Sequence, residues 1–472
     1  MFRVTTVAAL VLAAGPLAGQ GPGLPTQTWP AGTYLGAMDK GGRVTTFHRG
    51  WLYLGAQDDT SVWDISDPTD PQMEQFSAIG VNGHSWYKIG DLFWRQYWIP
   101  EHLDADPPQF QSLANPLVRV PWTQPMHFPI GTWRWHFLST YPLSIGNDVV
   151  DVRTGQQLSD RNLSAEDGIN AGLSFRIGNL LFFTPGDEQT GVSVFDVGDP
   201  ANPVLLDVLS GNFRQYTTAW QVWRNYVVLM SGDETNGPDQ NANLVAIDFS
   251  DPTDLQVGFT LPYSTLPGRY VHFQDEFGFA GRFNVGRKVN LETGQIAQSF
   301  QPPPGGVFED FQWIPLGHLL MMSQAQVGSS HSYLYAHRPD LDDDRPYVGY
   351  HLPVDGAVDQ PVGTVIGLVI NEELDDTTIH DGTIEVRPLG GASIEGTVVS
   401  TQYDVVNFTP EPALLPNTTY EVRVRGDGIR DLAGNRIQYT TFRFSTGPSL
   451  ATCILCDGFE SGDTGAWSTP AP

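Results

Sequence analysis

The chain has 472 residues, of which 40% are hydrophobic, so it is long enough for more than one folded domain and is not composed like a disordered protein. Asp and Glu number 53 against 25 Lys and Arg, which gives a formal net charge of −28. Such an acidic surface repels phosphate backbones and anionic lipid, and this excludes nucleic acid and the membrane surface as expected partners.

The first 19 residues have the pattern of a secretory signal peptide. Arg3 supplies a positive charge ahead of an apolar run from Val4 to Ala14, and the small residues Ala18 and Gly19 offer a cleavage site. The run is too short for a transmembrane helix, and no later segment is apolar enough to cross a membrane. We therefore expect an exported protein, secreted or held at the cell surface, with residues 1–19 as its signal peptide and no transmembrane segment.

A phrase of alternating apolar residues, an acidic residue and a Pro-containing turn recurs between residues 27 and 344. Clear copies read SVWDISDPTDPQ from Ser61, SVFDVGDPANPV from Ser193 and NLVAIDFSDPTD from Asn243. Weaker copies begin at Asp148, Arg287 and Ser332, and a degenerate copy begins at Tyr97. Most neighbouring copies lie roughly 45 residues apart, and strand-like segments with hairpin turns precede them.

Seven such units predict an all-β fold whose first domain is a seven-bladed β-propeller over residues 27–344. A four-stranded unit of this length cannot bury both of its faces alone, whereas a ring lets each sheet pack on the next. A linear solenoid is the alternative, but solenoid repeats are usually shorter or contain helices. The strand-like segment 33–38 precedes the first hairpin and the last unit lacks a strand of its own, so we expect 33–38 to complete the last blade.

The VFDVGDPANP-type phrase resembles the LVIVD-type repeat of secreted bacterial β-propellers. The resemblance implies the propeller fold and says almost nothing about the ligand. The Asp that follows the apolar residues is expected to cap the turn to the next strand through its carboxylate, as at Asp64, Asp196 and Asp248.

Two features of the propeller segment are candidates for ligand binding. Aromatic planes stack on sugars or peptides at exposed faces, and the least repeat-like part of the chain is rich in tryptophan. The candidate ligand-binding residues are Trp94, Trp98, Trp122, Trp133 and Trp135, although packing between blades is the commoner role of such side chains. The acidic loop Gly232–Asn243 lengthens one unit, and such loops project from one face, where ligands are met.

The propeller segment ends in an acidic stretch. Because Ca²⁺ prefers carboxylate oxygens, the candidate metal-binding residues are Asp340, Asp342, Asp343 and Asp344, with the ion stiffening the joint to the next domain. The full spacing of a calcium loop is missing, and a solvated linker is the simpler interpretation. Apart from Ca²⁺, the sequence suggests no cofactor.

From residue 346 the pattern changes to short alternating strands separated by Pro, Gly and Asn turns, which predict an Ig-like β-sandwich over residues 346–447. The series L-P-x-x-x-Y from Leu415 and D-x-A-G-N from Asp431 resembles the bacterial Ig-like domain first described in surface-layer proteins. The resemblance implies a spacer or scaffold. A calcium role for Asp427 and Asp431 is a minor alternative.

Residues 448–472 are predicted to be a flexible tail. The stretch DGFESGD, followed by Trp467, resembles the C-terminal tails of exported proteins of some Gram-negative bacteria, which implies a sorting motif. Cys453 and Cys456 are the only cysteines. A zinc site would need a second pair and a redox site would need a βαβ context, so a local disulfide or a processing site is the better interpretation.

No catalytic motif is present in the sequence. It has no G-x-S-x-G, Walker A or dinucleotide-binding motif, and its histidines are scattered without metal-ligand spacing. We therefore expect a secreted or cell-surface binding and display protein, with the propeller as the recognition face for a protein or glycan and the Ig-like domain as a spacer. An extracellular polysaccharide hydrolase or lyase with a site at the propeller axis is the first alternative. A structural component of a surface layer or matrix is the second.

Overall fold

The computed structural model of the chain describes part of the first 170 residues and most of the rest. The described residues are 20–42, 44–55, 60–77, 87–89, 92–95, 109–112, 119–121, 143–145, 148–151, 156–159, 171–185, 191–199, 202–211, 221–231, 243–262, 264–266, 271–282, 285–301, 303, 311–324, 331–401 and 404–448. Their regular structure is β-strand, apart from the short 3-10 helix η2 (Asp376–Thr378). No helix among these residues is long and apolar enough to span a bilayer.

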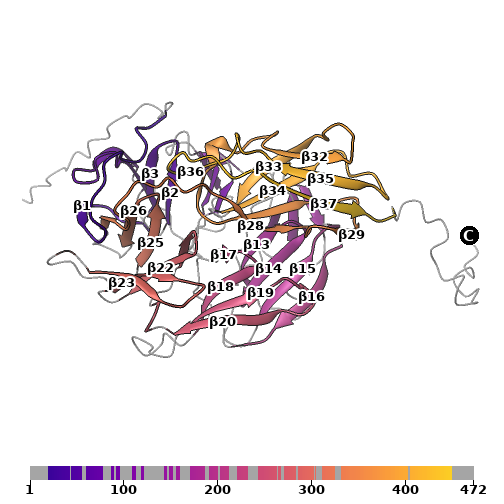
Figure 1. Cartoon of the computed structure of the whole chain (residues 1–472), viewed down its shortest axis with the longest axis horizontal. Helices are drawn as coiled ribbons and strands as arrows, with labels where there is room; N and C mark the ends of the chain where they lie inside the picture. Colours follow the sequence, from indigo (N-terminus) through magenta and orange to yellow (C-terminus); the bar gives the residue numbers. More distant parts are fainter. Residues whose placement is uncertain are drawn as a thin grey trace, which may run out of the picture.

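The N-terminal two thirds of the chain folds into a β-propeller, in which each sheet is an antiparallel meander of consecutive strands (Figure 1). The first three sheets are β2 (Val44–His48), β3 (Trp51–Gly55), β4 (Thr60–Asp64) and β5 (Gln72–Ser77); β6 (Tyr87–Ile89), β7 (Leu92–Arg95), β8 (Gln109–Ser112) and β9 (Arg119–Pro121); and β10 (Leu143–Ile145), β11 (Asp148–Asp151) and β12 (Gln156–Ser159).

Four further sheets follow in chain order. They are β13 (Ala171–Ile177), β14 (Leu180–Pro185), β15 (Val192–Asp196) and β16 (Val204–Leu209); β17 (Gln221–Trp223), β18 (Tyr226–Ser231), β19 (Asn243–Asp248) and β20 (Gln256–Pro262); β21 (His272–Gln274), β22 (Phe277–Arg282), β23 (Val285–Asn290) and β24 (Ile296–Phe300); and β25 (Phe311–Leu316), β26 (Leu319–Gln324) and β27 (Ser332–Ala336) with β1 (Tyr34–Met38). The described propeller strands thus group into seven meanders, of which β6–β9 continues through β33 (Gly396–Thr401) into a sheet of the C-terminal domain, while the number of blades itself stays a prediction.

The clear copies of the recurring phrase form the third strands β4, β15 and β19 of their sheets, and these strands are buried because sheets pack on both of their faces. The copy from Asp148 begins with β11, the middle strand of its sheet, and the degenerate copy from Tyr97 lies almost wholly outside the described residues. In β4, β15 and β19 four consecutive residues are buried, and the terminal Asp is half-buried at the turn-side end. The expected cap is confirmed: the Oδ1 atoms of Asp64, Asp196 and Asp248 accept hydrogen bonds from backbone N–H groups two residues later, at 2.8, 2.7 and 2.8 Å.

Buried apolar clusters connect successive sheets. Phe182 shares a cluster with Val245 of the next sheet, Leu244 shares one with Phe273 of the sheet after that, and Ile314 shares one with Trp63 of the first sheet. The rings of Phe300 and Trp313 contact each other between the last two sheets. Two glycines allow the tightest of these contacts, because a Cβ at Gly281 or Gly286 would lie 2.0 or 2.3 Å from the indole of Trp313. The sheets therefore stabilise one another by mutual burial of apolar surface.

The first and last strands of the propeller pair with each other. β1 runs antiparallel to β27, with Met38 opposite Ser332 and Tyr34 opposite Tyr335. Leu35 and Met38 point into the cluster that also holds Leu334. A strand from the start of the chain therefore completes the sheet formed by its last propeller strands.

The C-terminal domain is an Ig-like sandwich. One sheet contains β28 (Val348–Leu352), β30 (Ile366–Ile370), β34 (Val405–Pro410) and β33 (Gly396–Thr401), and the other contains β29 (Ala357–Gln360), β37 (Thr440–Thr446), β35 (Thr419–Val424) and β32 (Ile384–Pro388). A ribbon of β31 (Leu374–Asp375) and β36 (Arg430–Asp431) lies beside them. The L-P-x-x-x-Y series has a local role, since the Tyr420 hydroxyl accepts a 2.7 Å hydrogen bond from Leu415 N.

The sandwich packs directly against the propeller. Figure 1 shows its orange and yellow strands beside the magenta sheet β13–β16. Gly178 donates its N–H to Asn407 Oδ1 at 2.7 Å, and a Cβ at Gly367 would lie 2.3 Å from Gly178 N, so the two backbones approach closely. Pairing of Thr401 with Ile89 also connects a sandwich sheet to the second propeller sheet.

Candidate functional site at the joint between the domains

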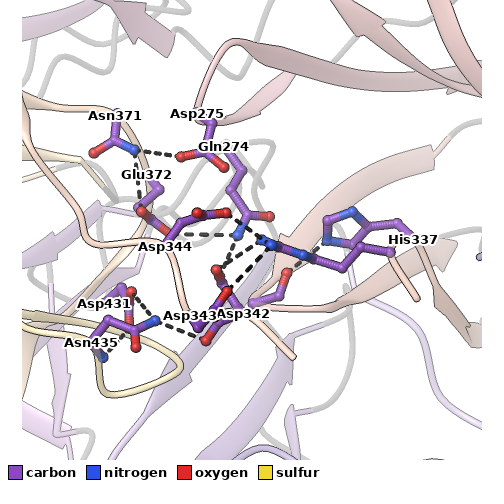
Figure 2. Close-up of polar contacts among 12 residues, drawn as sticks. Gln274, Asp275, His337, Asp342, Asp343, Asp344, Asn371, Glu372, Asp431 and Asn435 are labelled. Carbon is purple, nitrogen blue, oxygen red and sulfur yellow. Dashed lines mark hydrogen bonds and ion pairs between the residues drawn. The ribbon is translucent and has the colours of Figure 1, made fainter. Parts of the chain in front are cut away.

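Three buried carboxyl groups meet where the propeller, the linker and the sandwich come together (Figure 2). Asp342 lies in the linker between β27 and β28, Glu372 follows β30, and Asp431 ends β36. One carboxylate oxygen of each lies within 4.8 Å of those of the other two. The three residues are 6%, 4% and 1% exposed, so the cluster is removed from bulk water.

Asp342 is the member with a cationic partner. Arg338 Nη1 donates to its Oδ1 at 2.9 Å, while the other guanidinium nitrogen contacts Asp344 at 2.8 Å. The Oδ2 atom of Asp342 accepts a 2.6 Å hydrogen bond from Gln274 Nε2 of the propeller strand β21. Burial raises the pKa of Asp342, and Arg338 opposes this effect.

Of the three carboxyl groups, that of Glu372 has the weakest hydrogen bonds to offset its burial. Its Oε1 accepts a hydrogen bond from Asn371 Nδ2 at 3.2 Å, and its Oε2 accepts one from Gln274 Nε2 at 3.5 Å. Both distances are at the long end for N–H···O bonds. Burial, followed by the neighbouring carboxylates Asp431 and Asp342, raises the pKa of Glu372 well above its usual range.

Asp431 is positioned by the turn of the D-x-A-G-N series. Asn435 donates its backbone N–H to Asp431 Oδ1 at 2.8 Å and its side-chain Nδ2 to Oδ2 at 2.9 Å. Gly434 has a φ of +91°, which glycine adopts without strain and other residues do not. Burial outweighs these hydrogen bonds and raises the pKa of Asp431 to about 7.

A backbone pairing between the domains positions the cluster. Gln274 and Glu372 form an isolated antiparallel bridge, and Asp275 N donates to Asn371 O at 2.9 Å. In the same pair of residues, Asn371 Nδ2 donates a 2.8 Å hydrogen bond to Asp275 Oδ1 (Figure 2). Burial, and then Asp342 and Asp344, raise the pKa of Asp275 to about 6. A propeller hairpin turn is therefore hydrogen-bonded to the loop that carries Glu372.

The four linker aspartates that the sequence suggested as Ca²⁺ ligands do not share one site. Asp342 is buried in the cluster, whereas Asp340, Asp343 and Asp344 are exposed. The side chain of Asp343 is 90% exposed and lies 4.0 Å from Arg338, and Asp344 pairs with the same guanidinium. Of the second suggested pair, Asp431 joins the cluster, and Asp427 forms an exposed ion pair with Arg425.

The tryptophans suggested for ligand binding fall in a sparsely described stretch. Trp94 lies in β7, where its backbone pairs with Phe110 and Tyr87. Trp98, Trp122, Trp133 and Trp135 lie outside the described residues, as do residues 1–19, the tail from residue 449 and most of the loop Gly232–Asn243. A binding role for the tryptophans stays a prediction.

Sequence reasoning missed Glu372 and Gln274. Glu372 belongs to the acidic run E-E-L-D-D directly after a buried strand, and this run was the one available signal. Gln274 stands in a short propeller strand with no motif around it. Only the docking of the two domains brings these residues to Asp342.

The comparison with protein families assigns the second domain. Residues 342–446 match the family described as a bacterial Ig-like domain, and the match contains all three carboxylates of the cluster. Domains of this kind are typical of surface proteins, and this is consistent with a surface-associated protein. A search of curated proteins finds no match to the chain.

Several solved structures are similar to the chain. The WD40 domain of Pan2 from Neurospora crassa covers 68% of this chain and 99% of its own, with 10% identity and a TM-score of 0.46. Hsv2 from Kluyveromyces lactis covers 59% of this chain and 68% of its own, with 11% identity and a TM-score of 0.28. The N-terminal part of the bacterial surface-layer protein SbsC covers 22% and 24%, with 19% identity and a TM-score of 0.18. The similarities to LVIVD-type repeats and to exported C-terminal tails stay predictions.

Proposed function

We propose that this is an exported, surface-associated binding protein, in which one propeller face recognises a protein or glycan and the Ig-like domain holds the opposite face. The observation that carries the proposal is the docking of the linker and sandwich across successive hairpin turns of the propeller. Each of these turns joins the first and second strands of its sheet, so all of them lie on the same face of the ring.

The contacts repeat from sheet to sheet. His48, at the end of β2, binds Asp376 at 2.9 Å, and Asn179 Oδ1 accepts a 2.9 Å hydrogen bond from Val365 N. Asn371 donates to Asp275 at 2.8 Å, and Arg224 interacts electrostatically with Tyr347. A Cβ at Gly317 would lie 3.5 and 3.7 Å from the Cβ atoms of Ala433 and Asp342. Apolar packing accompanies these contacts, because Ile177 and Val222 share a buried cluster with Val369 and Val405 of the sandwich.

The sandwich contacts given above all lie on one face of the propeller, and we infer that a partner binds the opposite face. Since β18 runs away from the docked turn, its connection to β19 begins at the opposite face, and this connection carries the acidic loop Gly232–Asn243. A sandwich docked on one face of the propeller suits display of a binding surface on the other.

The test is binding of the full chain to immobilised polysaccharides, peptidoglycan and outer-membrane vesicles, measured by surface plasmon resonance. We expect saturable binding to at least one of them, a monomer in sedimentation velocity, and no new reducing ends in the polysaccharide samples. Release of reducing ends would favour the hydrolase or lyase alternative, and ordered self-assembly would favour a structural role; either result would overturn the proposal, as would a lack of binding to every probe.

A pair of matched variants locates the binding face. Glu234→Gln changes the acidic segment that connects β18 to β19, and Glu395→Gln makes the same change on the exposed surface of the sandwich. The proposal expects the first variant to weaken binding and the second to leave it unchanged. The reverse result would contradict the assignment of the faces.

A further inference from the structure

We propose that Asp342, Glu372 and Asp431 bind one Ca²⁺ ion, with Gln274 as a further ligand, and that the ion fastens the Ig-like domain to the propeller. The inference goes beyond the proposed function, because a cation at the joint does not depend on what the propeller recognises. It rests on the charge of the cluster, on an unpaired amide oxygen beside it, and on its dimensions.

The cluster has more buried negative charge than its surroundings compensate. Arg338 contacts Asp342, whereas Glu372 and Asp431 make no ion pair with any described residue. Taking a carboxylate out of water costs several kcal/mol unless a partner offsets it. The cluster must therefore keep protons or hold a cation, and a divalent ion shared by three carboxylates meets that need directly.

Gln274 supplies a separate indication of a ligand. Its side chain is 3% exposed, its Nε2 points between Asp342 and Glu372, and its Oε1 accepts no hydrogen bond from any described residue (Figure 2). A buried amide oxygen without a donor costs about 1–3 kcal/mol. Rotation of the amide by half a turn directs Oε1 at the carboxylates, which is repulsive for an empty cluster and favourable once a cation lies between them.

The dimensions fit Ca²⁺. Two oxygens bound to one Ca²⁺ at 2.3–2.6 Å lie at most about 5 Å apart, and the three carboxylate oxygens lie within 4.8 Å of one another. Mg²⁺, with bonds of about 2.1 Å and a strict octahedron, needs a smaller cage and keeps most of its water. Carboxylates with an amide oxygen are the ligands that Ca²⁺ takes most readily.

The ligands come from different parts of the fold. Gln274 belongs to the propeller, Asp342 to the linker, and Glu372 and Asp431 to the sandwich. An ion that binds all four binds the docked arrangement and not the separated domains. Its binding free energy therefore adds to the stability of the joint.

The experiment uses the full chain, stripped with a chelator and then titrated with CaCl₂ in a calorimeter, with MgCl₂ as the comparison. We expect one Ca²⁺ per chain with a dissociation constant of about 10⁻⁴ to 10⁻³ M, the range of extracellular calcium modules. The midpoint of thermal unfolding is expected to rise by several degrees in millimolar Ca²⁺ and to change less in Mg²⁺. If Ca²⁺ neither releases heat nor shifts the midpoint, the cluster is held by protons alone and the proposal is wrong.

Three variants test whether Ca²⁺ binds at the carboxylate cluster. Glu372→Gln removes a charge but keeps the shape, so it is expected to fold without Ca²⁺ and to weaken Ca²⁺ binding at least about tenfold. Gln274→Glu adds a carboxylate, so it is expected to lower the midpoint in chelator and to tighten Ca²⁺ binding. Asp343→Asn, an exposed linker control, is expected to bind as the unmodified chain does. Equal Ca²⁺ binding by Glu372→Gln and the unmodified chain would overturn the assignment.

Discussion

His337, directly after β27, is a buried side chain that the fold keeps neutral. Its Nε2 donates to Gly317 O at 2.7 Å, and its Nδ1 accepts from Lys288 Nζ at 3.4 Å, so both ring nitrogens are used by the neutral tautomer. Burial, and then the charge of Lys288, lower its pKa well below 6.5, and Arg338 adds to the effect. Protonation of Nδ1 would place its new N–H against the Lys288 ammonium, with the cation Arg338 also nearby.

This environment predicts an acid-sensitive contribution to stability. Between pH 7 and pH 5 the unfolded chain takes up a proton at this residue while the folded chain does not, so stability falls as the pH falls. The loss amounts to about 2 kcal/mol at pH 5 for a His with an ordinary unfolded pKa. Urea unfolding at the two pH values measures it.

The matched control is His337→Gln, which keeps a donor and an acceptor but does not titrate. The variant is expected to lose about 2 kcal/mol less than the unmodified chain over the same pH interval. The carboxylates of the joint titrate alike in both proteins and cancel in the difference. Equal losses in the two proteins would show that His337 is not the responsible group.

At the scale of elements, β1 contributes to propeller stability from the start of the chain. Met38 is fully buried between β27 and the first sheet, whereas Met73 in β5 is 38% exposed. Met38→Ala is expected to lower the free energy of unfolding by about 2–5 kcal/mol, because it removes buried side-chain atoms and leaves a cavity. Met73→Ala is expected to change it by less than about 0.5 kcal/mol.

Denaturant unfolding of the two variants, followed by intrinsic fluorescence, measures the difference. The same truncation at two sites separates burial from the loss of methionine itself. Similar values for both variants would mean that β1 adds little to the stability of the propeller.

Those strands and turns whose residues follow a local pattern could be predicted from the sequence. The third strands β4, β15 and β19 could be predicted, because their continuous apolar residues and Asp-capped turns are local features, as Asp64 and Asp248 illustrate. The third strand of the second sheet, β8, has no such pattern and was not predicted. The sandwich was predictable from Leu415 to Tyr420 and from Asp431 to Asn435, where turn geometry requires particular residues. The family match over residues 342–446 supports that reading.

The candidate site was predictable only in part. The sequence marks Asp342 and Asp431 as candidate ligands, but it groups Asp342 with Asp340, Asp343 and Asp344, and Asp431 with Asp427. The neighbours are exposed because the linker and the turn each direct a single carboxylate inward. Glu372 and Gln274 join them through contacts between the domains, and no periodicity within one segment contains that information.

At the scale of the whole molecule, the propeller and the Ig-like domain form one docked unit. The buried apolar cluster shared by Ile177 and Val369, the close approach of Gly178 and Gly367, and the hydrogen bonds at successive hairpin turns all fix the same relative orientation. A flexible linker between independent domains would leave these surfaces exposed to water. A fixed orientation fits the proposed display function, because the propeller face opposite the sandwich then points in one direction.

The most direct test of this arrangement is the distance between the two domains in solution, measured by double electron–electron resonance. Spin labels at Glu74→Cys in the propeller and Glu395→Cys in the sandwich, with Cys453→Ser and Cys456→Ser in the tail, report that distance in the full chain. We expect one narrow distance distribution that is unchanged when the chain is diluted. A broad or bimodal distribution would show that the domains move independently, and would contradict both the fixed propeller face and the joint on which the proposed Ca²⁺ site depends.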